Sequence, residues 1–253
     1  MRPLTLLLLL PLLTAGCAWL PDQVDETTGM NASELYSLAK EALGEHNYEM
    51  AIDYYVKLEG RYPYGRYAEQ AQLETAYAHY KAQEPAAAVA AADRFIKLHP
   101  RHPHVAYAYY LRGLAMFEPG DNFLERFVPT DKTGRDPAAA REAFGYFQEL
   151  ITRFPDSRYT KDAVQRMTYL RNRLADYEVR VAAFYLTRGA DVAAAERAGY
   201  VVENYDRTPA VPEALALMVE AYRRMEMGAL ADDALRVLRL NYPDHPALKR
   251  VAG

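Results

Sequence analysis

Apolar and polar positions repeat in the same order in five segments of the chain. The segments end at Pro63, Pro100, Pro155, Asp206 and Pro243. An alanine lies twelve residues before each end, and apolar residues lie eight and five residues before it. Because steps of four and three residues return to one side of an α-helix, each segment predicts an amphipathic helix. Proline cannot continue the hydrogen-bond ladder, so it predicts where four of these helices stop.

A second helix is expected before each of these five. The segment ends are 37 residues apart except before Pro155 and Asp206, where the interval is longer. When the extra residues of these two intervals are left out of the count, small residues fall at one matching position of the preceding helix: Ala39, Ala76, Gly113 and Ala182. Small residues let two helices approach closely. The expected helices cover residues 31–45, 48–61, 67–82, 85–98, 104–116, 136–153 and 159–187, and a regular fifth pair covers 211–242. The sequence therefore predicts an all-α, tetratricopeptide-like helical solenoid of five helix pairs, about ten helices in all.

Two intervals exceed the regular 37 residues. The interval before Pro155 has 18 extra residues, which predict an insertion in repeat three over residues 118–135. This insertion either folds back on its own scaffold or contacts a partner. The interval before Asp206 has 14 extra residues, and residues 159–187 contain no Gly or Pro. Fourteen residues make about four helical turns, so we expect a long helix to open repeat four, with a bend near Asp176 left open. It should bridge the two halves of the solenoid or meet a partner.

The chain begins with the features of an export signal. A basic start, a ten-residue apolar run and small residues precede Cys17, the only cysteine. The run is too short to span a bilayer. The stretch before Cys17 resembles a bacterial lipobox, with Thr14 in the usual leucine position. We interpret residues 1–16 as a lipoprotein-type signal peptide, Cys17 as the lipidated residue and residues 17–30 as lipidated N-terminus and tether. The alternative is an ordinary signal followed by an unrelated cysteine.

Charge and motifs narrow the class of protein. A net charge of −4 with no run of Lys or Arg argues against a nucleic-acid partner. One cysteine excludes a disulfide framework and a cysteine-based zinc site. No phosphate-binding loop, nucleophile elbow or zinc-protease motif occurs, so we expect no enzyme activity and no cofactor beyond the covalent lipid. His99, His102 and His104 crowd one stretch, which we interpret as a turn between repeats and not as a zinc site.

A helical solenoid presents a concave face to segments of a partner. Candidate residues on the first helices of the pairs are Tyr77, Tyr80, Tyr107, Tyr109 and Tyr110. Tyrosine is favoured at interfaces, although half of these are expected to be packing residues. Arg94 and Lys97 lie one turn apart and offer a basic spot for a carboxylate, unless they form only a solvated face. Arg197 stands among alanines, where it either docks an acidic group of a partner or extends along the surface to water.

Several phrases of the chain resemble one family. They are RYPYGRYAEQAQLETAYAHYK, DRFIKLHPRHP, YYLRGLAMF, RDPAAAREAF and LADYEVRVAAFYLTRGA. With the lipobox and the five repeats, they make nearly the whole mature chain similar to the BamD (ComL/YfiO) family, lipoproteins of β-barrel assembly.

The resemblance implies a non-catalytic scaffold of the outer-membrane protein assembly (BAM) complex, lipid-anchored at the periplasmic face of the outer membrane. The implied partners are the POTRA region of BamA, the small lipoproteins BamC and BamE where present, and unfolded outer-membrane proteins. Residues 31–135 would receive substrate, and Arg94 and Lys97 match basic positions of that half. Residues 136–253 would bind BamA, and Arg197 matches a family arginine that faces BamA. The alternative is another periplasmic tetratricopeptide lipoprotein that serves as a cell-envelope or peptidoglycan-enzyme adaptor.

Overall fold

The computed structural model describes residues 25–117 and 137–252. Within these residues the chain forms eleven α-helices and no strand. They are α1 (Ala32–Gly44), α2 (Tyr48–Arg61), α3 (Arg66–Lys81), α4 (Pro85–Leu98), α5 (Val105–Met116), α6 (Ala138–Arg153), α7 (Thr160–Thr187), α8 (Asp191–Asn204), α9 (Val211–Arg224), α10 (Gly228–Asn241) and α11 (Pro246–Val251). The expected helices agree with these bounds to within about two residues, as is usual for helix ends.

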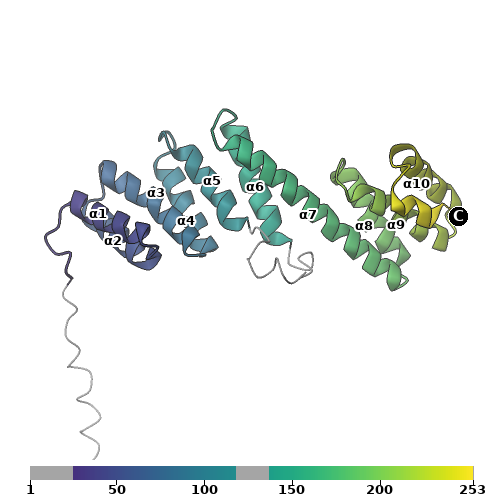
Figure 1. The fold of residues 1–253 in the computed structure, drawn as a ribbon, viewed down its shortest axis with the longest axis horizontal. Coiled ribbons are helices and arrows are strands. Elements are labelled where there is room, and N and C mark those ends of the chain that lie inside the picture. Colours follow the sequence, from purple (N-terminus) through teal and green to yellow (C-terminus); the bar gives the residue numbers. More distant parts are fainter. Residues whose placement is uncertain (1–24, 118–136, 253) are drawn as a thin grey trace, which may run out of the picture.

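The helices follow one another in a single elongated row (Figure 1). Each of α1 to α9 packs against the next helix in the chain, and α10 packs on α9. The first helices of neighbouring repeats also touch: α1 packs on α3, α3 on α5 and α7 on α9, and Tyr110 of α5 donates a hydrogen bond to Asp162 of α7. The prediction of an all-α, tetratricopeptide-like solenoid of five helix pairs is confirmed.

The repeated positions form the core of each pair. The five alanines are buried: Ala51, Ala88, Ala143, Ala194 and Ala231. The residues seven places further on are fully buried as well: Leu58, Phe95, Leu150, Val201 and Leu238. Large side chains from one helix thus pack against small ones, which lets the two helices of a pair approach closely.

The residue directly before each segment end departs from this pattern. These five residues follow the buried position by a further step of four, which would put them on the same face of the helix, but they are partly exposed helix caps: Tyr62, His99, Phe154, Tyr205 and Tyr242. Each donates its backbone N–H to the carbonyl four residues earlier, at 2.8–2.9 Å, and then leaves helical geometry. A following proline disfavours helical geometry in the residue before it. Tyr205 adopts a similar cap before Asp206, where no proline stands.

Gly113 confirms the register across the long third interval. It lies on α5 at the predicted small position and is buried against Phe147 of α6. A Cβ at position 113 would lie within 2.8 Å of Cζ of that ring and closer still to two other ring carbons. The helices of repeat three therefore pack at a distance that only glycine permits.

The long helix α7 runs without a break for 28 residues, from Thr160 to Thr187. Its first half contributes Ala163 and Leu170 to the same core cluster as α5 and α6. Its second half contributes Val179 and Ala182 to the cluster of α8 and α9. The helix therefore joins the two halves of the solenoid, as expected, by belonging to the core of both (Figure 1).

Both ends of the described chain are held by specific contacts. At the start, Arg61 of α2 donates to the backbone oxygen of Thr27 at 2.5 Å and pairs with Asp25, and the Tyr62 hydroxyl donates to the Met30 oxygen at 2.9 Å. Residues 25–30 thus lie against α2. At the other end, the unpredicted helix α11 buries Val251 against α9 and α10.

Candidate partner-binding surfaces

Five half-buried tyrosines gather on the first helices of repeats two to four. We call them the tyrosine cluster: Tyr77 and Tyr80 on α3, Tyr107 and Tyr110 on α5, and Tyr159 just before α7. Tyr77, Tyr80 and Tyr107 pack on one hydrophobic core cluster. The ring centroid of Tyr159 lies 5.3 Å from that of Tyr107 and 4.9 Å from that of Tyr110, with which it is stacked. The structure thus brings the three predicted groove tyrosines together.

The hydroxyl groups of this cluster sit in differing surroundings. Burial raises the pKa of Tyr107 well above its usual value. Burial, reinforced by the hydrogen bond that Tyr110 donates to Asp162 of α7, raises the pKa of Tyr110 to about 12. The hydroxyls of Tyr107 and Tyr110 are therefore neutral at physiological pH. The cluster as a whole offers apolar rings with polar edges, which suits the binding of extended peptide segments. Tyr109, in contrast, is buried, with its ring 5.2 Å from that of Phe154, and is a packing residue.

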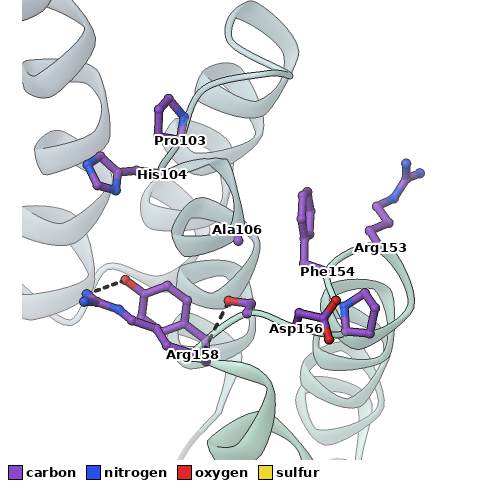
Figure 2. A pocket seen from close by; sticks show the side chains of 10 residues that line it. Pro103, His104, Ala106, Arg153, Phe154, Asp156 and Arg158 are labelled. Carbon is purple, nitrogen blue, oxygen red and sulfur yellow. Dashed lines mark hydrogen bonds between the residues drawn. The ribbon is translucent and has the colours of Figure 1, made fainter.

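An open groove of about 560 Å³ adjoins the cluster at Tyr159 (Figure 2). It lies between the start of α5 and the turn from α6 to α7. Arg158 lines it, donates to the Tyr159 hydroxyl at 2.8 Å and lies 4.8 Å above the Tyr159 ring. His104 and Arg153 also line the groove, with Asp156 as the acidic member. The groove therefore extends the tyrosine cluster with two arginines and one acidic side chain among its lining residues.

A second polar network lies nearer the N-terminus, around Glu74 of α3. This carboxylate accepts hydrogen bonds from the hydroxyls of Tyr36 (2.9 Å) and Tyr55 and pairs with Lys40 at 3.1 Å. Sequence reasoning did not single out Glu74. A signal existed, however: Tyr55 stands at a core position that is Ala, Phe or Leu in the other repeats. A buried hydroxyl there needs a hydrogen-bond partner.

Arg94 and Lys97 lie on α4, the second helix of repeat two, apart from the helices that carry the tyrosines. Arg94 pairs with Glu59 of α2 at 3.0 Å. Burial of Glu59 raises the pKa of its carboxyl group, and the Arg94 charge opposes that rise. Lys97 is exposed. The structure therefore does not bring the two basic residues together with Tyr77, Tyr80 and Tyr107, and their role in binding stays a prediction.

Arg197 lies on α8 with its side chain about half exposed (47%). It donates at 2.9 Å to one carboxylate oxygen of Glu178, a residue of α7 whose side chain is 2% exposed. Arg141 of α6 donates at 3.1 Å to the other oxygen. Sequence reasoning found Arg197 but not its two neighbours. Arg197 is thus held on its own chain while keeping surface available to a partner, and its role in binding also stays a prediction.

The three histidines form the turn between α4 and α5. His99 lies 2.7 Å from the Gln72 side-chain oxygen, and His102 lies 3.6 Å from Glu69. Burial lowers the pKa of His102, so it is neutral at physiological pH. In residues 25–117 and 137–252, no group of three or more His, Cys, Asp or Glu side chains is placed to hold a metal ion.

Some sequence predictions concern residues outside the described part of the chain. These are the signal peptide, the lipidated Cys17 and the insertion over residues 118–135. Among the described helices, none is both long enough and apolar enough to cross a membrane.

The fold and these surfaces define a tetratricopeptide-like repeat protein with candidate surfaces for protein partners. A family model described as YfiO, outer membrane lipoprotein, matches residues 28–238. The chain belongs to this family, as the sequence resemblance predicted.

Curated relatives carry the name outer membrane protein assembly factor BamD. The relative from Neisseria meningitidis serogroup B is 44% identical over 224 residues, which are 88% of this chain and 84% of the relative. Those from Xylella fastidiosa strain Temecula1 and Vibrio cholerae are 42% and 37% identical, over 87% and 89% of this chain and 75% and 92% of each relative.

Proposed function

We propose that this chain is a scaffold of outer-membrane protein assembly that acts by holding other proteins together. The proposal is supported by its family and by relatives named outer membrane protein assembly factor. The described structure supplies two different surfaces on one rigid solenoid, the tyrosine cluster in one half and the Arg197 region in the other. A scaffold needs at least two such surfaces.

The first partner is the periplasmic POTRA region of BamA, bound by the C-terminal repeats. The observation that carries this assignment is the guanidinium group of Arg197, half exposed yet fixed by a buried carboxylate. Fixing a long side chain before binding lowers the entropy lost in the complex. Small lipoproteins such as BamC and BamE, where present, would join the same assembly.

The second partner is an unfolded outer-membrane protein, received by the N-terminal repeats. Unfolded β-strands expose alternating apolar and polar side chains together with unpaired backbone groups. The tyrosine cluster offers ring faces to the apolar side chains and hydroxyl groups to the unpaired backbone groups. The adjoining groove, with Arg153 and Arg158, adds positive charge for acidic or terminal carboxylate groups of the segment.

The scaffold is held at the periplasmic face of the outer membrane by lipid on Cys17. Each buried CH₂ of an acyl chain contributes about 0.8 kcal/mol, so several chains anchor a protein firmly. Cys17→Ser is expected to move the protein from the membrane fraction to the soluble fraction. Retention of the Cys17→Ser protein in membranes through a wash at high pH would contradict the anchor.

Co-purification tests the partner assignment. The full-length protein, extracted in mild detergent, is expected to bring down BamA from the same organism. Arg197→Gln is the informative variant, because Glu178 then keeps Arg141 as a partner and the fold is preserved. It should reduce the recovered BamA at unchanged melting temperature, whereas Arg236→Gln, which removes an exposed ion pair with Asp233 on α10, should not. Recovery of the wild-type protein without BamA would overturn the proposed function.

A further inference from the structure

A charged residue occupies a core position in repeat four. Glu178 lies 28 residues before Asp206, and the matching residues of repeats one and five are the buried Leu35 and Leu215. Glu178 is equally buried, with 2% of its side chain exposed. A carboxylate in such a place is costly unless charged groups pair with it. The matching position holds leucine in repeats one and five and Gln72 in repeat two, so a carboxylate this deeply buried in repeat four calls for a reason beyond packing.

Two helices, α6 and α8, each supply one arginine that pairs with Glu178 of α7. Arg141 of α6 takes one oxygen at 3.1 Å, and Arg197 of α8 takes the other at 2.9 Å. The nitrogens that donate are therefore held by the two oxygens of one carboxylate. Two arginines 56 positions apart in sequence, one from the helix before α7 and one from the helix after it, are thus brought to one carboxylate.

The two arginines remain open to solvent while the acid between them does not. Their side chains are 50% and 47% exposed, against 2% for Glu178. Each guanidinium carries five N–H donors. Within residues 25–117 and 137–252, Glu178 is the only ion-pair partner of either arginine. Two positive charges and one buried negative charge leave one positive charge at the surface, with spare donors on both sides.

We propose that Arg141 and Arg197 form a single binding site for one carboxylate of a partner protein, and that Glu178 is the positioning residue that sets the two guanidinium groups at the right spacing. The site rests on the proposed function, since Arg197 alone is assigned there to BamA. It adds a second arginine from α6, the helix that precedes α7. The incoming Asp or Glu side chain would complete an alternating arrangement of two positive and two negative charges.

Charge favours a carboxylate over a phosphate as the ligand. A single negative charge matches the one positive charge left at the surface. A phosphate monoester carries close to two negative charges at pH 7 and would meet stronger repulsion from the buried Glu178. Planar carboxylates also accept two parallel hydrogen bonds from arginine. An acidic side chain on a protein is therefore the ligand that the site fits.

The test measures affinity of the full-length protein for the periplasmic region of BamA from the same organism. Arg141→Gln and Arg197→Gln are each expected to weaken binding about tenfold or more, since each removes half of one site. The double variant should lose little beyond either single variant, because neither arginine works alone. Arg197→Lys should also lose affinity while keeping the charge. The matched control is Arg171→Gln on α7, which removes one exposed ion pair with Asp206. Melting temperatures of all variants show that the fold is kept.

Glu178→Gln separates positioning from simple electrostatics. Removing a negative charge beneath an anion site should tighten binding if charge alone mattered. If Glu178 positions the arginines, the same change weakens binding. A tighter complex would overturn the positioning role.

The remaining outcomes are also decisive. Absence of wild-type binding would overturn the proposed function itself. Wild-type binding that falls with Arg197→Gln but not with Arg141→Gln would leave the proposed function standing and overturn the two-arginine site. Sedimentation with vesicles containing anionic phospholipid provides the last comparison. If both arginine variants lost vesicle binding and kept BamA binding, the ligand would be a phosphate and the proposal would be wrong.

Discussion

The ring of Phe147 occupies the space that a Cβ on Gly113 would need. Both residues are buried, and Phe147 is enclosed by the core of repeat three, so the ring has little room to move. Gly113→Ala should therefore destabilise the protein by about 1–3 kcal/mol, the usual cost of overpacking. Thermal unfolding measures the effect. The control is Gly145→Ala on α6, where a Cβ meets nothing within 4 Å, and alanine there should stabilise the helix by up to about 1 kcal/mol. Equal melting temperatures for the two variants would contradict the close approach.

Removing the buried hydroxyl of Tyr55 should also weaken the fold. That hydroxyl donates to Glu74, and a hydrogen bond to a charged group contributes about 1.5–3 kcal/mol. Because Glu74 keeps Tyr36 and Lys40, we expect Tyr55→Phe to cost an amount near the lower end of this range. Urea unfolding gives the difference. Tyr64→Phe, at a side chain that is 91% exposed, should leave the midpoint unchanged. An unaltered midpoint for Tyr55→Phe would show that the network contributes nothing to stability.

The docking of residues 25–30 should depend on acid pH. The Thr27 hydroxyl and backbone N–H donate to Asp25, and Lys57 and Arg61 add positive charge, so the pKa of Asp25 falls from 3.8 to about 2. A folded-state pKa below the unfolded value contributes stability that is present above about pH 4 and is lost as the pH falls through about 2. Carbon-13 NMR of the carboxyl group measures the midpoint directly. A midpoint near 3.8 would mean that the segment is not docked, and Asp25→Asn should loosen it at every pH.

A break in α7 should separate the two halves of the solenoid. Proline inside a helix removes a hydrogen bond and clashes with the preceding turn, which costs about 3 kcal/mol or more. Asn172→Pro places this break near the end of the part of α7 that packs with α6, between Leu170 and Leu174 and shortly before the part that packs with α8. Calorimetry should then show two transitions, where the wild-type protein and Asn172→Ala show one. A single transition in the proline variant would argue that the halves are coupled elsewhere.

Sequence alone predicted the helix pairs because the same spacing of alanine and apolar residues occurs in five segments of the chain. Ala51 and its four counterparts, read against their segment ends, located even the long helix α7. The six residues of α11 were too short to show a helical period. The exposed position of Tyr62 was missed because the pattern does not show that a residue before proline leaves the helix.

The candidate surfaces were less predictable from sequence. Tyr77, Tyr80 and Tyr107 were predicted as candidates because the first helices of the pairs in a solenoid line its concave face. Glu178 was missed because a charged residue within a long helix is usually solvated, and nothing local reveals that two distant arginines meet it. Long-range pairs of this kind depend on how helices cross, which local periodicity does not encode.

The 28 residues of α7 span about 42 Å at 1.5 Å per residue. Most repeat solenoids bend at the joints between repeats, since each unit touches only its neighbours. In this chain the continuous helix α7 spans the central joint, and its two ends pack in different core clusters. A load applied where α7 packs with α5 and α6 would therefore reach α8 and α9 as a displacement of the whole helix and would not be absorbed by a hinge.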